Sequence, residues 1–172
     1  GFVTSRATSY GIETGFSNNT IQILNNTASD NGNSGIFTNA CAGCLIDNNV
    51  ALRNISYGIN TTNNSSGQRN QIISRNTAGN NGLKGIYNSD YEGVVISNTA
   101  YGTTGTGATD GGIYANGPSL VFNNISFGNA GLGITTGWQS SKGVYANNLS
   151  FGNKSHGFYS QSADNIVFNN NV

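Results

Sequence analysis

Charge is scarce in this sequence, and neither sign is in excess. Seven Lys and Arg balance seven Asp and Glu over 172 residues, so only 8% of the chain is charged. Binding to nucleic acid or to an anionic membrane surface requires clustered basic side chains. We therefore expect no nucleic-acid partner. We also expect no membrane span, because no apolar run approaches the roughly 20 residues that one requires.

The chain is also poor in cysteine, with two residues that form the stretch CAGC, Cys41 and Cys44. A tetrahedral zinc site needs further Cys or His ligands, and the only histidine is His156. No βαβ pattern surrounds the pair, as a redox motif would require. The sequence therefore favours a local disulfide or two semi-buried thiols over redox or metal chemistry.

What the sequence has in abundance is glycine, asparagine and an internal repeat. A glycine followed by an apolar residue recurs at intervals of 21 to 27 residues. These glycines are Gly11, Gly35, Gly58, Gly85, Gly112, Gly133 and Gly157. A period in this range is typical of solenoids and related repeat architectures.

A second column of residues has the same period. One asparagine per repeat follows a short β-rich run, at Asn26, Asn49, Asn76, Asn98, Asn124, Asn148 and Asn170. An apolar or aromatic residue stands three positions before each, and Ala, Ser or Val stands two positions after. Five positions after come Asn31, Asn54, Asn81, Thr103, Asn129 and Asn153.

These columns predict an all-β solenoid in which each coil stacks on the next. The β-branched runs are too short for helices, and a repeat of about 24 residues cannot bury its own apolar side. Stacked coils can do so when their strands pair in parallel, about 4.8 Å apart. Asparagines at one corner can then hydrogen-bond from coil to coil, which gives a structural ladder.

The pattern IxxNxA…N…GI resembles the repeats of the pectate-lyase-like superfamily, over almost the whole chain. The resemblance implies a right-handed, single-stranded parallel β-helix of about seven coils, with residues 1–172 as one domain. Lyases of this kind use a Lys or Arg as base, often with acidic calcium ligands on one face. The scaffold also occurs in hydrolases, epimerases, adhesins and surface proteins. No catalytic position of the family can be matched residue by residue, so the catalytic residues are left unassigned.

Two repeats of 27 residues carry insertions, and such loops often build a solenoid's binding groove. Candidate ligand-binding residues near them are Lys84, Tyr87, Asp90, Glu92, Asp110 and Tyr114. Asp90 and Glu92 could bind calcium through oxygen atoms, although a solvated turn is the favoured interpretation. No cofactor is otherwise expected. Tyr87 and Tyr114 could stack on sugar rings, or adjacent corners could simply shield them.

We expect both ends of the solenoid to be open, because neither terminal segment reads as a cap. The chain would then be a segment of a longer β-helix, or copies would pair end to end in a filament. The leading hypothesis is a non-catalytic structural or adhesive module, extracellular or at the cell surface. The alternative is the repeat core of a carbohydrate-active enzyme acting on polyuronate or a related polysaccharide. An ice-binding role would need a regular outward threonine array, whereas the column of Thr14, Thr38, Thr61 and Thr136 is broken and expected to face inward.

Overall fold

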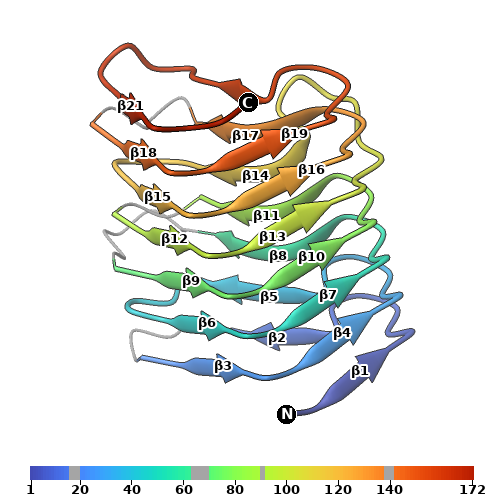
Figure 1. Cartoon of the computed structure of the whole chain (residues 1–172). Helices are drawn as coiled ribbons and strands as arrows, with labels where there is room; N and C mark the ends of the chain where they lie inside the picture. The colour runs from blue at the N-terminus through green and yellow to red at the C-terminus, as the bar shows by residue number, and fades with distance from the viewer. Residues whose placement is uncertain (16–19, 63–69, 90–91, 138–141) are drawn as a thin grey trace.

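The computed structural model describes residues 1–15, 20–62, 70–89, 92–137 and 142–172. These residues form a right-handed parallel β-solenoid that contains no helix among them. Figure 1 shows the coils stacked from the N-terminus at the bottom to the C-terminus at the top. The predicted fold class and the period near 24 residues are confirmed.

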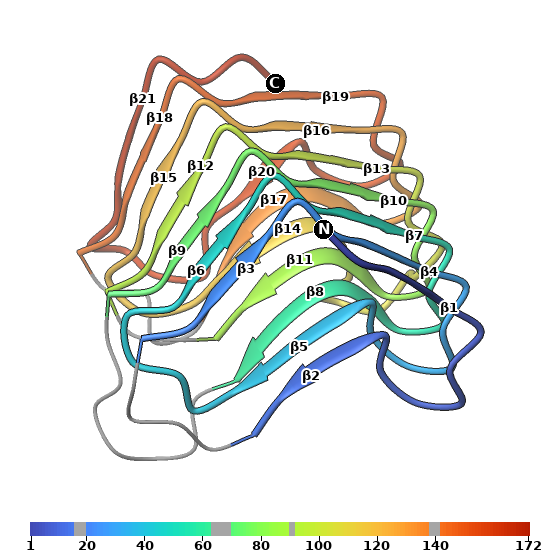
Figure 2. The ribbon, with the colours of Figure 1, turned by 90° about the horizontal axis from the view of Figure 1, so that it is seen from below.

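Three parallel sheets, here named A, B and C, form the sides of the solenoid, and each contains seven strands. Figure 2 shows their arrangement along the stacking direction. Sheet A consists of β1 (Val3–Ser5), β4 (Thr27–Ser29), β7 (Val50–Leu52), β10 (Thr77–Gly79), β13 (Thr99–Tyr101), β16 (Ile125–Phe127) and β19 (Leu149–Phe151).

Each coil continues from sheet A to sheet B and then to sheet C. Sheet B consists of β2 (Ile12–Thr14), β5 (Ile36–Asn39), β8 (Tyr57–Thr62), β11 (Lys84–Asn88), β14 (Gly111–Ala115), β17 (Leu132–Thr136) and β20 (Phe158–Tyr159). Sheet C consists of β3 (Gln22–Leu24), β6 (Leu45–Asp47), β9 (Ile72–Ser74), β12 (Val94–Ile96), β15 (Leu120–Phe122), β18 (Val144–Ala146) and β21 (Ile166–Phe168).

The core is built from columns of identical or similar side chains. Sheet B contributes an isoleucine column in which Ile36, Ile59 and Ile86 are fully buried. Sheet A contributes small residues such as Ala78 and Ala100, because the backbone of sheet B comes close to them at glycines such as Gly85. A Cβ atom on Gly85 would lie 2.9 Å from the Cβ of Ala100 and 2.7 Å from the carbonyl oxygen of Gly112. The Gly-apolar step therefore reflects close packing inside the coil.

The predicted asparagine ladder is present at the corner between sheets C and A. Its central members, Asn49, Asn76, Asn98 and Asn124, are at most 1% exposed. The Oδ1 atom of Asn76 accepts the backbone N–H of Asn49 at 2.9 Å and its side-chain amide at 3.0 Å. The amide nitrogen of Asn76 donates to Asn98 Oδ1 at 3.0 Å and to the carbonyl of Ile46 at 2.8 Å. The Asn76 amide thus joins its own coil to both neighbouring coils and satisfies buried backbone groups.

The corner that carries the asparagine ladder requires the left-handed backbone conformation. The residue before each ladder asparagine has a positive φ, for example Asn48 (53°), Ser97 (57°) and Asn123 (55°). A second ladder follows the equivalent corner between sheets A and B, where Asn54 Nδ2 donates to Asn81 Oδ1 at 3.0 Å. The abundance of asparagine and glycine follows from these corners, because both residues tolerate positive φ.

The inward threonine column is also present, and it excludes the ice-binding alternative on this face. Thr38, Thr61 and Thr136 are fully buried. Thr61 Oγ1 donates to Asn88 Oδ1 at 2.9 Å within the same column. These hydroxyl groups line the interior and present no array to solvent.

Candidate functional site

The outer face of sheet B brings together four of the six predicted ligand-binding residues. Lys84 and Tyr87 lie on β11, Tyr114 lies on β14, and Asp110 directly precedes β14. The parallel register places Tyr87 beside Tyr114 and Lys84 beside Tyr57 of β8. The ring centroids of Tyr57 and Tyr87 lie 5.3 Å apart, and those of Tyr87 and Tyr114 lie 5.0 Å apart. We call Tyr57, Lys84, Tyr87, Asp110 and Tyr114 the tyrosine–lysine cluster.

Lys84 is the centre of this cluster and is almost fully buried, with 6% of its surface exposed. Its Nζ atom lies 2.9 Å from Asp110 Oδ1. The same atom lies 5.7, 5.4 and 5.6 Å from the ring centroids of Tyr57, Tyr87 and Tyr114. A cation at this distance is attracted by the negative face of an aromatic ring. The Lys84 ammonium group therefore occupies the aromatic cage that these three tyrosine rings form.

Asp110 fastens the loop that precedes β14 to the sheet. Its Oδ2 atom accepts the backbone N–H of Gly107 at 2.9 Å, and its own N–H donates to the Gly107 carbonyl at 2.9 Å. The next residue, Gly111, donates its N–H to the carbonyl of Leu83 at 3.2 Å. The ion pair and these backbone bonds together hold one of the predicted insertions against the outer face of sheet B.

The tyrosine next to Lys84 is held in its neutral form. Burial raises the pKa of Tyr57 above its ordinary value of 10.0, and electrostatic interactions with Tyr87 and Asp110 raise it further. Tyr57 is therefore a phenol at neutral pH. Its hydroxyl group can take part in hydrogen bonds there, but its phenolate is not available as a base.

The two remaining predicted residues are not part of the described cluster. Asp90 lies outside the described residues. Glu92 is exposed and has a positive φ of 58° at the corner before sheet C. Within the described ranges, no group of three or more His, Cys, Asp or Glu residues is placed to hold a metal ion. Calcium binding by Asp90 and Glu92 stays a prediction.

The sequence interpretation missed Tyr57, although a signal for it was available. Tyr57 and Lys84 each stand directly before the glycine of the Gly-apolar step, in a column that also contains Tyr10 and His156. This column lies on the outer face of sheet B, next to the column that contains Phe37, Tyr87, Tyr114 and Tyr159. Accordingly, Tyr10 stacks on Phe37 with centroids 4.4 Å apart, and His156 lies 5.5 Å from Tyr159.

A hollow of about 310 Å³ continues this face toward the C-terminal coils. It is lined by Ala108, Leu132, Ser155, His156, Tyr159 and Gln161. The Oε1 atom of Gln161 is buried, and none of the described residues donates a hydrogen bond to it. An aromatic ring beside an amide acceptor suits a polar ligand that has an apolar face.

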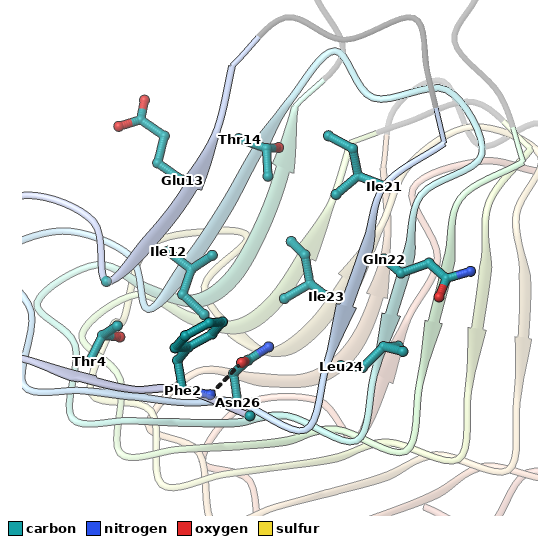
Figure 3. Close-up of a pocket in the computed structure, with 12 residues that line it drawn as sticks. Phe2, Thr4, Ile12, Glu13, Thr14, Ile21, Gln22, Ile23, Leu24 and Asn26 are labelled. Atoms are coloured by element: carbon teal, nitrogen blue, oxygen red, sulfur yellow. Dashed lines mark hydrogen bonds between the residues drawn. The ribbon is translucent and has the colours of Figure 1, made fainter.

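Another hollow, of about 670 Å³, lies inside the first coil of the solenoid. Figure 3 shows Ile12, Ile21 and Ile23 pointing into it, with Phe2 at its edge. Phe2 occupies the ladder position of the first coil, and its N–H donates to Asn26 Oδ1 at 2.8 Å. The walls of this hollow are core side chains of the solenoid, so it offers no convergent set of catalytic groups.

Two further ion pairs lie at the solenoid corners. Arg53 forms a bidentate pair with Asp30, with both contacts at 2.7 Å. Arg75 pairs with Asp47, which also accepts the hydroxyl of Ser74 at 2.6 Å. Both pairs bridge successive coils at the surface and contribute no member to the cluster on sheet B.

These corner pairs predict a loss of stability in acid. The hydrogen bond from Arg53 holds the pKa of Asp30 below its ordinary 3.8. Burial alone would raise the pKa of Asp47, but hydrogen bonds from Ser74 and Arg75 outweigh burial and lower it. A carboxylate with a lowered folded-state pKa stabilises the fold above about pH 4, and this contribution is lost as the pH falls through the folded pKa. We expect the urea midpoint to fall between pH 4 and pH 2, and to fall less steeply in Arg75→Gln. An equal slope in this variant would contradict the assignment for Asp47.

Cys41 and Cys44 form a disulfide at the corner between β5 and β6, and both residues are fully buried. The Gln71 amide of the next coil donates to the carbonyl of Cys41 at 2.8 Å.

The described residues contain no helix long and apolar enough to cross a membrane.

Comparisons of the chain with protein-family models, with curated proteins and with solved structures find no match.

Proposed function

We propose that this chain is a non-catalytic β-helix of the pectate-lyase-like superfamily, with a structural or adhesive role outside the cell or at its surface. The observation that carries this proposal is the ion pair of Lys84 and Asp110 within the tyrosine cage. A lyase-type mechanism needs a basic side chain that is free to accept a proton from the substrate. Lys84 is instead buried and charge-paired.

The contact surface in this proposal is the outer face of sheet B, and its ligand is polysaccharide. Aromatic rings follow this face from Tyr10 and Phe37 through the tyrosine–lysine cluster to Tyr159. Rings in such a row can stack on the apolar faces of sugars. Because Lys84 is already neutralised by Asp110, a neutral glycan fits the described face better than a polyuronate does.

The extracellular location is supported by the disulfide between Cys41 and Cys44. Disulfides form and persist mainly in oxidising compartments.

End-to-end stacking is also part of the proposal, since β3 and β21 form the two edges of sheet C.

The test is to measure binding and turnover together on a panel of neutral and uronate polysaccharides. We expect co-sedimentation with at least one neutral polysaccharide, and no ultraviolet absorbance of unsaturated product in the presence of calcium. Tyr87→Ala should weaken binding about tenfold, since it removes a central ring of the row. Tyr101→Ala is the matched control, because Tyr101 stacks with Phe127 on sheet A instead. Product absorbance would support the enzyme alternative, and a panel without any binding would contradict the proposed ligand.

A further inference from the structure

Several asparagines of the chain stand in the motif N-x-S/T, which is the acceptor of N-linked glycans in secreted proteins. Those in the described ranges are Asn25, Asn54, Asn60, Asn124, Asn148 and Asn153. The motif alone does not say which of them an enzyme can reach, because side chains along a strand alternate between the core and solvent. The position of each asparagine relative to the ladders makes this distinction.

Most of these asparagines are ladder members, and their amides are fully engaged inside the solenoid. Asn124 Nδ2 donates to the carbonyl of Val95 at 2.9 Å and to Asn148 Oδ1 at 3.0 Å. Ser126, two positions after Asn124, is fully buried as well. The amide nitrogens of Asn54, Asn148 and Asn153 likewise donate two hydrogen bonds each. Asn60 lies in sheet B beside Tyr87 and is only 7% exposed.

Among the described motifs, the one at Asn25 is shifted by one residue relative to the ladder. Its middle residue is the ladder asparagine Asn26, which points inward and is 6% exposed. Asn25 and Thr27 therefore point outward, and Asn25 is exposed while Thr27 is half-buried. The amide and the hydroxyl group of this motif thus lie on the same accessible side of the corner.

The amide nitrogen of Asn25 is also available for a substituent. Its Oδ1 atom accepts the side-chain amide of Asn48 at 2.7 Å, whereas no described residue accepts a hydrogen bond from its Nδ2 atom. The register that pairs Val3 with Thr27 places Gly1 at this position of the preceding coil, and glycine has no side chain to accept one. A sugar on Nδ2 would therefore replace no hydrogen bond between described residues.

We propose that Asn25 carries an N-linked glycan. The donor is an oligosaccharide joined to a lipid through a diphosphate, and Asn25 Nδ2 attacks its anomeric carbon. A C–N bond forms, the bond from this carbon to the diphosphate oxygen breaks, the lipid diphosphate leaves with the electron pair, and Nδ2 loses one proton to solvent. The transfer takes place along a secretory route, so it rests on the extracellular location proposed above. Figure 2 shows the corner between sheets C and A across the solenoid from sheet B, so the glycan leaves the proposed polysaccharide face open.

The test is site-resolved mass spectrometry of the folded, unglycosylated chain after incubation with a lipid-linked oligosaccharide and a single-subunit oligosaccharyltransferase that recognises N-x-S/T. Occupancy at Asn25 should exceed that at Asn54, Asn124, Asn148 and Asn153 by about tenfold or more, because the ladder must open before these amides are exposed. Peptides that contain each motif should all be modified, which controls for the sequence preference of the enzyme.

A gain of site provides the matched control. Asn48, Asn49 and Val50 repeat the same arrangement one coil further on, and Asn48 is exposed. Val50→Thr completes the motif there and should install a second glycan, at Asn48. Thr27→Val should abolish the glycan at Asn25 and leave the chain folded, because the residue paired with Thr27 in the register is Val50.

A folded chain that stays unmodified at Asn25, or that is modified equally at Asn25 and Asn124, would overturn the proposal. A Val50→Thr variant without a glycan at Asn48 would contradict the outward orientation on which it depends. Co-sedimentation with polysaccharide separates this proposal from the proposed function. Modification at Asn25 without any polysaccharide binding contradicts the proposed ligand alone, and binding by a chain that stays unmodified contradicts the glycan site alone.

Discussion

Replacing Asn76 by alanine is expected to lower the free energy of unfolding by about 4 kcal/mol. The side chain makes four hydrogen bonds, two from Asn49 and one each to Asn98 and the Ile46 carbonyl. All four hydrogen bonds are buried, and each lost bond costs about 1 kcal/mol. The fall should appear in urea denaturation and as a decrease of roughly 10 °C in Tm.

Two variants separate the loss of hydrogen bonds from the loss of volume. Asn76→Asp keeps the shape but replaces the donor by an oxygen that faces Asn98 Oδ1, so it should destabilise at neutral pH at least as much as alanine does. Asn170→Ala removes the last ladder member, whose amide donates to the Tyr145 carbonyl at 2.9 Å in a partly exposed coil. It should cost less than half as much. Equal losses at Asn76 and Asn170 would contradict a cooperative ladder.

Replacing Lys84 by methionine is expected to cost about 3 kcal/mol of stability. Methionine keeps much of the apolar stem, but Asp110 would lose its cation and the three tyrosine rings would lose their central charge. Removing one partner of a buried ion pair typically costs 3–5 kcal/mol. The lower value applies here because the Asp110 side chain is 15% exposed and also accepts the Gly107 N–H. Chemical denaturation measures the loss.

The double variant Lys84→Met/Asp110→Asn tests whether the loss comes from the unpaired carboxylate. Asparagine can still accept the Gly107 N–H, so the double variant should recover more than half of the stability lost in Lys84→Met. Lys154→Met is a surface control that should change stability by less than about 0.5 kcal/mol. If the double variant is as unstable as Lys84→Met alone, the carboxylate is not the cause.

The fold was predictable because its rules repeat once per coil. A single Gly-apolar step is ordinary, but seven of them in register with a column of asparagines leave few alternatives. The second column, at Asn54, Asn81 and Asn129, was visible in the sequence as well, and it forms the second ladder. Its partner atoms are visible only in three dimensions. The Oδ1 atoms of Asn54 and Asn81 each accept a backbone and a side-chain N–H, and Asn129 Oδ1 accepts the backbone N–H and the hydroxyl group of Thr103.

The candidate site was predictable only in part, because its residues obey no periodic rule. Lys84, Tyr87, Asp110 and Tyr114 were chosen for their proximity to the insertions, and they do lie together. The burial of Lys84 by its own tyrosines could not be predicted, because it depends on how the insertion before Asp110 folds back. Tyr57 lies one coil before Lys84 in the same column, so only the parallel register brings it to the cluster.

The sequence does not distinguish the outward apolar residues of sheet C from core residues. Strands such as VVI and LVF have apolar residues at all three positions, and only the middle one can point inward. The number of sheets decides which residues are outward. Because each coil was expected to contain two or three strands, the sequence alone could not separate inner from outer residues.

The stacking of the coils in register is the central claim, and distances between outward residues of sheet A test it most directly. Spin labels at position 27 and, in separate samples, at positions 99, 125 and 149 sample three, four and five coil steps. The account predicts separations that increase by about 4.8 Å per step, near 14, 19 and 24 Å. Separations that do not increase linearly with the number of coils would contradict it.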